Sequence, residues 1–220
     1  MGYYPVFLDL DKARCLVIGG GTIAERKVEA LLAAGGEVTL ISPELTAALR
    51  ALEAAGRLTV QQRPYQREDL DAVSLVIAAT DDPALQRQIA ADAKRANILC
   101  NIVDQPALCS LIMPAMVQRG DLTIAVSTNG ASPTLAKKIR QDLTEQFGPE
   151  YAVALRLLRR IRERLMHEQC SARDRQRLLT SLAESPLLDY LRARQTDKLD
   201  ALLQRTLGEA YTLERLAFSW

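Results

Sequence analysis

The sequence has 220 residues, with 28 basic and 27 acidic side chains, so its formal net charge is +1. Apolar residues make up 48% of it, which is enough for a substantial buried core. The balanced charge argues against a nucleic-acid or anionic-lipid partner, and no apolar run is long enough to span a membrane. We therefore expect a cytoplasmic protein that has neither nucleic acid nor membrane as a partner.

In the first half of the chain, short apolar runs alternate with helical patterns. We expect strands at residues 14–18, 38–41, 58–61, 73–79 and 98–103. We expect helices at residues 22–34, from Pro43 to Gly56, and at residues 83–95. Strands at this spacing, joined by helices, are typical of parallel crossover units, and strands that are apolar throughout are buried on both faces. The sequence therefore predicts the α/β class, with a Rossmann-type parallel sheet over residues 1–110.

The pattern changes after Asp104. Residues 110–116 and 122–127 are two strand-like runs around a turn, and we expect them to pair antiparallel. Ser132 and Pro133 predict a helix start, because a hydroxyl caps the helix and proline fits its first position. From Leu135 the sequence is helical almost to its end, with a break at residues 148–149. We therefore expect a small α+β segment at residues 111–148 and a helical domain at residues 149–220.

The stretch GGGTIA at residues 19–24 fits the motif G-x-G-x-x-A, between an expected strand and an expected helix. In this motif Gly19 permits a tight turn, Gly21 lets the backbone approach a pyrophosphate, and Ala24 keeps the helix close to the strand. The N-terminus of the helix, which is the positive end of the helix dipole, also points at the phosphates. The motif therefore predicts a dinucleotide cofactor.

Polar residues follow the second expected strand, at the sheet edge where such folds bind ligands. Ser42, Pro43 and Glu44 stand where an NAD site usually has an acid that binds the ribose hydroxyls. Glu44 is either a substitute for that acid or a solvated carboxylate in the first turn of a helix. No arginine stands at this point to bind a 2′-phosphate, which favours NAD over NADP.

Further polar residues follow the fourth and fifth strands. Thr80 and Asp81 follow the fourth strand, and the next residue, Asp82, either faces the same crevice or only caps the next helix. A carboxylate just past the fifth strand would lie near the nicotinamide, where a general base is useful. Asp104 is therefore either a catalytic base or a structural residue. We expect these strand ends to contact the cofactor through Ser42, Thr80, Asp81, Asn101 and Val103.

The histidine and cysteine content limits the remaining chemistry. The cysteines at positions 15, 100, 109 and 170 form no CxxC pair, and we interpret them as buried or bystander thiols. A single histidine, His167, rules out a histidine-based metal cluster. We expect no protein metal site, so the chemistry must use carboxylates, hydroxyls, backbone groups or a cofactor.

Five segments occur in order along the chain, namely YPVFL at residues 4–8, GGGTIAERK at 19–27, NIVD at 101–104, IMP at 112–114 and STNGASP at 127–133. In this order they resemble segments of the precorrin-2 dehydrogenase/sirohydrochlorin ferrochelatase family of sirohaem synthesis. This family includes the N-terminal half of fused sirohaem synthases. The resemblance covers residues 3–145, whereas the helical tail agrees in length and type but not in motif.

The resemblance implies NAD-dependent oxidation of precorrin-2 to sirohydrochlorin, followed in many members by insertion of Fe²⁺ to give sirohaem. It implies that Asp104 is the essential carboxylate, for both proton removal and metalation. It implies contacts to NAD from Thr22, Ile23, Pro43 and Glu44. It also implies a homodimer, with residues 111–148 as the dimerisation segment.

The resemblance further places four residues in the substrate cleft, namely Met113, Thr128, Asn129 and Ser132. The family often has a phosphorylatable serine where this chain has Thr128, which puts that role in doubt. The substrate carries many carboxylate arms, and guanidinium groups bind carboxylates bidentately. The candidates for this binding, each of which is otherwise part of a solvated helix face, are Arg156, Arg159, Arg160, Arg162, Arg164, Arg173, Arg175 and Arg177, with Lys137, Lys138 and Arg140.

Two readings of the function stay open. These 220 residues contain no methyltransferase domain, so we expect a stand-alone form that receives precorrin-2 from a separate enzyme. Some stand-alone members only dehydrogenate, which leaves the ferrochelatase activity open. The alternative is a regulatory module that senses NAD or NADH without catalysis, which needs the glycine loop but no base at Asp104. DNA binding through the arginine-rich tail is a weaker alternative, because acids are interspersed with the arginines and no nucleic-acid motif is present.

Overall fold

The computed structural model describes residues 2–220, so Met1, where the expected first domain begins, lies outside the described residues. The chain forms two compact units, and the boundary between them falls between Met113 and Pro114. The expected boundary at residue 110 lies close to this division, and the expected separation of residues 111–148 from residues 149–220 stays a prediction. The predicted α/β class is confirmed, with a parallel sheet followed by antiparallel strands and a helical region.

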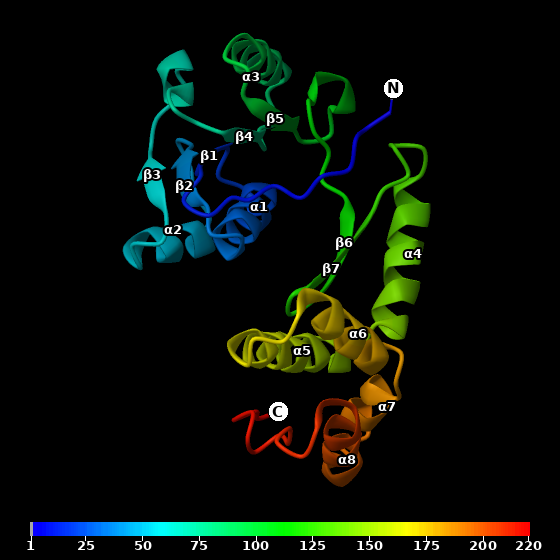
Figure 1. Ribbon diagram of the computed structural model, residues 1–220. Helices are drawn as coiled ribbons and strands as arrows, with labels where there is room; N and C mark the ends of the chain where they lie inside the picture. Colours follow the sequence, from blue (N-terminus) through cyan, green and yellow to red (C-terminus); the bar gives the residue numbers. More distant parts are fainter. Residues whose placement is uncertain (1) are drawn as a thin grey trace. The chain divides into compact units, whose positions relative to one another are not determined.

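The first unit is built on a five-stranded parallel sheet with the strand order β3-β2-β1-β4-β5 (Figure 1). The strands are β1 (Arg14–Ile18), β2 (Glu37–Ile41), β3 (Thr59–Gln61), β4 (Leu75–Ala78) and β5 (Leu99–Ile102). The α-helices are α1 (Thr22–Ala33), α2 (Ala47–Ala54) and α3 (Pro83–Arg95), and the 3-10 helices are η1 (Arg67–Leu70) and η2 (Pro106–Leu108). The chain runs outward in both directions from β1, so the β1–β4 edge is the switch point at which such sheets bind ligands.

Helices cover both faces of this sheet. On one face Val28 of α1 and Leu49 of α2 pack with Val17, and on the other Ile89 of α3 packs with Leu16. All five side chains are at most 1% exposed, and burying each is worth roughly 1.5–3 kcal/mol. Neighbouring strand residues point to opposite faces, which explains why these strands are apolar throughout.

Two expected boundaries are wrong. Helix α2 begins at Ala47 rather than at Pro43, because the Thr46 hydroxyl accepts the Leu49 N–H at 3.3 Å and so caps the helix there. The strand expected from residue 110 begins only at Ala115. The segment before it runs along β5 instead, where the Ser110 N–H donates to the Cys100 carbonyl at 2.9 Å.

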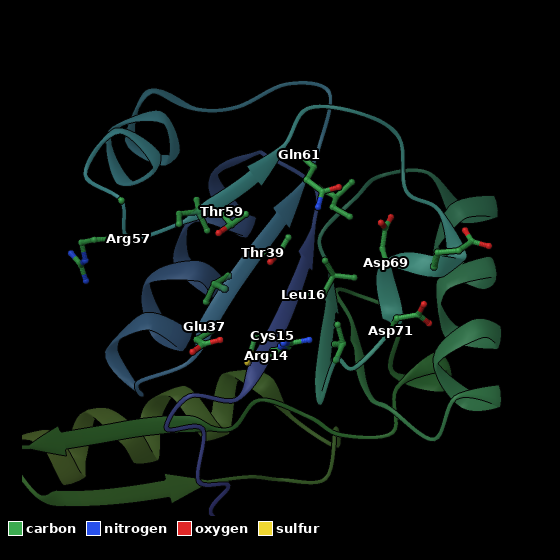
Figure 2. Close-up of a pocket in the computed structure, with 16 residues that line it drawn as sticks. Arg14, Cys15, Leu16, Glu37, Thr39, Arg57, Thr59, Gln61, Asp69 and Asp71 are labelled. Carbon is green, nitrogen blue, oxygen red and sulfur yellow. The ribbon is translucent and has the colours of Figure 1, made fainter.

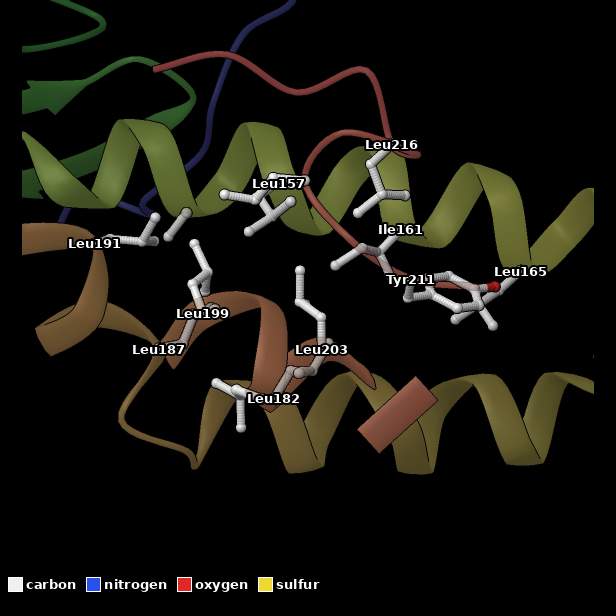
Figure 3. Close-up of a cluster of buried hydrophobic side chains, with 13 residues drawn as sticks. Leu157, Ile161, Leu165, Leu182, Leu187, Leu191, Leu199, Leu203, Tyr211 and Leu216 are labelled. Atoms are coloured by element: carbon white, nitrogen blue, oxygen red, sulfur yellow. The ribbon is translucent and has the colours of Figure 1, made fainter. Parts of the chain in front are cut away.

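The second unit combines a β-hairpin with helices. Strands β6 (Ala115–Arg119) and β7 (Leu122–Val126) pair antiparallel, as predicted. The helices are α4 (Pro133–Gln146), α5 (Glu150–His167), α6 (Ala172–Ala183), α7 (Leu187–Arg192) and α8 (Thr196–Leu207). Leu157 and Ile161 of α5 meet Leu182 of α6 and Leu203 of α8 in a core of their own (Figure 3). In the part of the chain that the structure describes, no helix combines the length and apolarity needed to cross a membrane.

Candidate functional site

Two of the three glycines after β1 are required by the fold itself. Gly19 has a φ of +111°, and a Cβ there would lie 2.1 Å from the carbonyl oxygen of Ala79, just after β4. A Cβ at Gly20 would lie 1.8 Å from the carbonyl oxygen of Glu44, in the loop after β2. Any side chain at either position would therefore push apart the loops that meet at this edge of the sheet.

Gly21 is different, because the protein itself does not require a glycine there. A Cβ at Gly21 would meet no protein atom within 4 Å, and the φ of −83° is open to any residue. Gly21 is the N-cap of α1 and provides no side-chain hydrogen bond, whereas Thr46 caps α2 and Asp82 caps α3. The first N–H groups of α1 therefore have no side-chain acceptor, and they lie at the positive end of the helix. The backbone at this helix end therefore suits an anion, and the space in front of it is free of protein atoms.

The first residues of α1 lie beside this space. Thr22 is exposed and Ile23 is 41% exposed, which is unusual for a large apolar side chain next to a buried sheet. An apolar surface at the start of the helix suits a cofactor that covers it. Their contact with NAD stays a prediction.

The end of β2 provides one buried hydroxyl and one exposed carboxylate. The Ser42 hydroxyl is buried and donates to the Glu44 carbonyl at 2.7 Å, which fixes the loop. Pro43 and Glu44 are exposed. Glu44 precedes α2, so its interpretation as a carboxylate in the first helical turn is wrong. The expected contacts of these three residues with the ribose stay predictions.

An arginine that the sequence pattern did not predict also lies near this strand end. Arg63 follows β3, and the carbonyl of Gln61 in that strand accepts the Ser42 N–H at 3.3 Å. The Arg63 guanidinium is ion-paired with Asp69, with one hydrogen bond of 2.9 Å, and the Asp69 side chain is only 7% exposed. Burial raises the pKa of Asp69, but the bonds from Arg63 and the Gln66 N–H outweigh it and hold that pKa below its usual range. The positive charge of Arg63 is therefore already balanced by a carboxylate.

The loop after β4 is held by side chains of α3. Asp82 accepts the Ala84 N–H at 2.8 Å, which confirms its role as a helix cap. Gln86 is buried and donates from Nε2 to the carbonyl of Thr80 at 2.6 Å, so it fixes the loop that borders Gly19. Gln86 was not predicted from the sequence, because a glutamine in a helical pattern normally lies at the surface. Thr80 is half-buried and Asp81 is exposed, and their cofactor contacts stay predictions.

Asp104 lies in a tight turn directly after β5. Its φ is +59°, a conformation that aspartate tolerates better than most residues, and its side chain is exposed. The Gln105 N–H closes the turn on the Ile102 carbonyl at 3.2 Å. The Cys109 sulfur accepts the Ile102 N–H at 3.2 Å and lies 3.3 Å from the Gln105 carbonyl oxygen. Cys109, which the sequence presented as a bystander thiol, thus fixes the turn that carries the candidate base.

Asn101 and Val103 have structural contacts on either side of the same turn. Asn101 is buried, and its Nδ2 donates to the Leu111 carbonyl at 3.1 Å. The Val103 side chain packs against the core cluster that contains Val28 of α1. Both residues therefore hold the turn of Asp104 in place, and their expected contacts with the cofactor stay predictions.

Lys27 of α1 is a second charged group near the candidate base. Its side chain is half-buried, and it lies on the helix between Ala24 and Val28, both of which are fully buried. Burial lowers the pKa of Lys27, and the negative charge of Asp104 raises it in part. The sequence marked Lys27 only as part of a motif, and the structure adds that its charge is close enough to interact with Asp104.

The residues expected in the substrate cleft lie in both units. Thr128, Asn129 and Ser132 share the loop between β7 and α4, where the Thr128 hydroxyl accepts the Ser132 N–H at 3.1 Å. The Ser132 hydroxyl accepts the Leu135 N–H at 3.1 Å and caps α4. Both hydroxyls thus fix this loop. Met113 is 37% exposed at the end of the first unit, and the gathering of all four residues around one substrate stays a prediction.

A hollow of about 530 Å³ opens on the face of the sheet opposite α1, beside Leu16 and Ile41 (Figure 2). It arises where the crossover from β3 to β4 contains only the short η1 rather than an α-helix. Gln61 and Asp69 line it, but no glycine of the loop after β1 does. The candidate cofactor site is therefore the loop edge and not this hollow.

Comparisons with known proteins agree with this geometry. Residues 6–115 match a family model described as NAD(P)-binding, and residues 119–146 match one described as sirohaem biosynthesis protein central. A siroheme synthase of Pseudomonas entomophila is 38% identical over 210 residues, which cover 96% of this chain and 45% of that protein. One of Nitrosospira multiformis is 36% identical over 94% of this chain. The chain spans about half the length of the curated relatives that it matches.

One solved structure is matched over its full length. It is titled "SirC, precorrin-2 dehydrogenase", and it matches with a TM-score of 0.78 and 31% sequence identity. The match covers 95% of this chain and 100% of that one. The fold of both units, and not only the dinucleotide-binding half, is therefore shared.

Proposed function

We propose that this chain, which belongs to the family of sirohaem synthases and precorrin-2 dehydrogenases, oxidises precorrin-2 to sirohydrochlorin. NAD⁺ is the oxidant in this proposal. The observation that supports this most directly is the uncapped N-terminus of α1 at Gly21, on the same sheet edge as the exposed Asp104. The glycine loop provides the place for the pyrophosphate, and Asp104 provides a carboxylate one strand beyond β4.

The reaction removes a hydride and a proton from the macrocycle. The dinucleotide, when bound, accepts the hydride. The chain must provide a group that takes the proton, and Asp104 is exposed to do so on a turn fixed by Cys109. The one histidine, His167, belongs to α5 in the second unit. A carboxylate base is therefore the assignment that we make.

We infer NAD rather than NADP as the cofactor. Glu44 presents an exposed carboxylate after β2, where it suits ribose hydroxyls and repels a 2′-phosphate. Arg63, which would favour a phosphate, is already paired with the nearly buried Asp69. Both features lower the affinity for NADP relative to NAD.

We extend the proposal to the insertion of Fe²⁺ into sirohydrochlorin, which the siroheme synthase names of the curated relatives support. Fe²⁺ is then a substrate that binds to the nitrogens of the macrocycle in place of two N–H protons, which pass to a base or to solvent. Among the residues that the structure describes, no group of three or more His, Cys, Asp or Glu side chains could hold a metal ion. We also propose a homodimer formed through residues 111–148, which sedimentation of the purified chain tests directly.

The decisive experiment is turnover by the purified chain. With precorrin-2 and NAD⁺ we expect the visible spectrum of sirohydrochlorin together with the absorbance of NADH. Asp104→Asn tests the base more specifically than Asp104→Ala would, because asparagine tolerates the left-handed backbone and removes only the negative charge. We expect it to bind NAD⁺ like the wild type and to lose activity, by about 10²-fold or more.

The outcomes separate the proposals. Binding of NAD⁺ without any turnover of precorrin-2 by the wild type would contradict the proposed dehydrogenase activity and support the NAD-sensing alternative. A fully active Asp104→Asn variant would contradict only the assignment of the base. Addition of Fe²⁺, or Co²⁺ as a surrogate, to sirohydrochlorin and the chain tests the chelatase activity separately.

A further inference from the structure

Arg63 lies beside the end of β2, where the proposed site binds the ribose of the cofactor. The backbone N–H groups of Ser42 and Arg63 both donate to the Gln61 carbonyl, at 3.3 and 2.9 Å. Because the two residues share one acceptor, the end of β3 brings Arg63 next to the loop that follows β2. In a dinucleotide-binding sheet, an arginine near this strand end is the group that accommodates the 2′-phosphate of NADP.

The guanidinium group of Arg63 is held by three other residues of the first unit. Its Nη1 donates to the Asp69 carboxylate and to the Pro64 carbonyl, each at 2.9 Å. Its Nη2 donates to the second oxygen of Asp69 and to the side-chain oxygen of Gln61. Asp69 thus binds the guanidinium group bidentately, and of these three partners it is the one that carries a charge.

Asp69 is the more deeply placed member of this ion pair. Its side chain is 7% exposed, whereas the Arg63 side chain is 32% exposed. Asp69 also accepts the Gln66 N–H at 2.7 Å. Burial raises the pKa of Asp69, but the bonds from Arg63 and the Gln66 N–H outweigh it, so the carboxylate is charged at neutral pH. The acid therefore determines where the guanidinium group stays and balances its charge there.

The crossover that carries Asp69 is anchored independently of the ion pair. Tyr65 is buried, and its hydroxyl donates to the buried carboxylate of Asp92 on α3 at 3.2 Å. Leu70, at the end of η1, is buried in the same cluster as Tyr65 and Ile89 of α3. Loss of the Asp69 charge should therefore leave the crossover in place and release only the guanidinium group.

We propose that Asp69 is a positioning residue that selects against NADP, because it holds and neutralises the arginine that would otherwise bind the 2′-phosphate. The inference rests on the proposed function, since it requires a dinucleotide at the glycine loop with its ribose at the end of β2. Asp69 acts through Arg63 and does not itself contact the cofactor. The choice of cofactor then depends on a nearly buried carboxylate of η1 as well as on Glu44.

Titration calorimetry of the full chain with NADP⁺ and with NAD⁺, without the macrocycle, tests this directly. Asparagine has the shape of aspartate and keeps an oxygen for the Gln66 N–H, so Asp69→Asn removes little more than the charge. We expect this variant to raise the affinity for NADP⁺ relative to NAD⁺ by about tenfold or more, because a phosphate then meets an unbalanced guanidinium group. Asp69→Ser, whose hydroxyl also accepts an N–H, is a second variant and should shift the ratio in the same direction.

Two further variants separate this effect from a change of net charge. Asp71→Asn is the matched control, because Asp71 is exposed and lines the same hollow as Asp69 (Figure 2). It removes one negative charge without releasing Arg63 and should keep the wild-type ratio of affinities. Arg63→Met in the Asp69→Asn background lacks the guanidinium group and should lose the gain for NADP⁺. Circular dichroism verifies that all variants keep their helices.

The inference is overturned if both Asp69 variants keep the wild-type ratio, since the ion pair then has only a structural role. It is also overturned if Asp71→Asn shows the same gain, or if the gain persists without Arg63. A wild type that binds neither dinucleotide would contradict the proposed function and the inference together. A shifted ratio in a chain that does not oxidise precorrin-2 would support the inference and contradict the proposed dehydrogenase.

Discussion

The three glycines that follow β1 differ in what a side chain at each position would meet. At Gly20 a methyl group would overlap the Glu44 carbonyl, whereas at Gly21 it would point into free space in front of α1. We therefore expect Gly20→Ala to destabilise the fold by about 1–3 kcal/mol or more. We expect Gly21→Ala to cost at most about 1 kcal/mol, yet to weaken NAD⁺ binding by about tenfold or more, because its methyl group occupies the space of the pyrophosphate.

Urea unfolding and NAD⁺ titration of both variants separate these two effects. Gly21→Ala should shift its unfolding midpoint only slightly and lose affinity for NAD⁺, whereas Gly20→Ala should show the larger loss of stability. Tight NAD⁺ binding by Gly21→Ala would show that the cofactor does not approach the helix at this point. The dinucleotide site would then have to be sought elsewhere on the sheet edge.

Lys27 gives a prediction on pH dependence. Burial lowers its pKa in the folded chain below the ordinary 10.5, with Asp104 opposing the shift in part. The folded state then binds fewer protons than the unfolded state between these two values, so Lys27 adds stability as the pH rises through the folded pKa towards 10.5. At neutral pH its charge is a cost.

We expect Lys27→Met to keep or raise the free energy of unfolding at neutral pH and to remove this alkaline gain. Urea unfolding from neutral pH upwards measures both effects. Lys94→Met, at an exposed position near the end of α3, is the control and should behave like the wild type. An unchanged pH slope in Lys27→Met would show that its ammonium group is not desolvated in the folded chain.

At the scale of elements, local sequence patterns were sufficient to predict a helix or loop where the residues next to it in sequence determine its structure. The bounds of α3 follow from Pro83 and the cap at Asp82, and the glycine motif identifies the loop after β1. The predicted start of α2 at Pro43 was wrong, because the capping hydroxyl of Thr46 also donates to the Glu25 carboxylate of α1 at 2.9 Å. A sequence pattern of one helix contains no such contact.

The same reason explains which site residues were missed. Cys109 acts on a turn several residues before it, and Arg63 is balanced by Asp69 of η1. Gln86 holds a carbonyl of the preceding loop from inside a helix. From residue type alone, Arg63 and Gln86 would be expected at the surface and Cys109 in the core. Only the fold shows that they position the strand ends around the candidate site.

Helix α5 begins at an ion pair in which the Glu150 carboxylate is buried and the Arg192 guanidinium is exposed, and this pair gives a prediction at the scale of elements. The Glu150 carboxylate accepts a bond of 2.6 Å from Arg192 of α7, and a Cβ at Gly148 would lie 2.3 Å from its Oε2. Burial raises the pKa of Glu150, but the bonds from Arg192 and from backbone N–H groups outweigh it and lower that pKa. The stability that Glu150 contributes is therefore present above its unfolded pKa and is lost as the pH falls through the folded value.

We expect Glu150→Gln to cost about 1–2 kcal/mol, discounted because the Arg192 side chain is 58% exposed, and to make unfolding less sensitive to acid. Urea midpoints from about pH 7 to pH 3 measure both effects. Glu184→Gln, at an exposed C-cap, is the control. Equal acid sensitivity in Glu150→Gln and the wild type would mean that other carboxylates dominate the acid unfolding.

On the scale of the whole molecule, the proposed cofactor site belongs to one of two compact units. The glycine loop and the ends of β2, β4 and β5 all lie in the first unit, which has its own cores on both faces of the sheet. The second unit has a separate core, which contains Ile161. The sequence indicated this separation through its change of pattern after Asp104. NAD⁺ should therefore stabilise the first unit more than the second.

Calorimetry of the full chain tests this separation, because a ligand raises the stability only of the unit that binds it. NAD⁺ at about one hundred times its Kd should add about 2.7 kcal/mol to the first unit and shift only that unit's transition. Ile161→Ala removes a fully buried side chain from the second unit, so it should cost that unit about 2–5 kcal/mol and lower the other transition. A single transition that shifts as a whole with NAD⁺ and with Ile161→Ala would show instead that the two units unfold together.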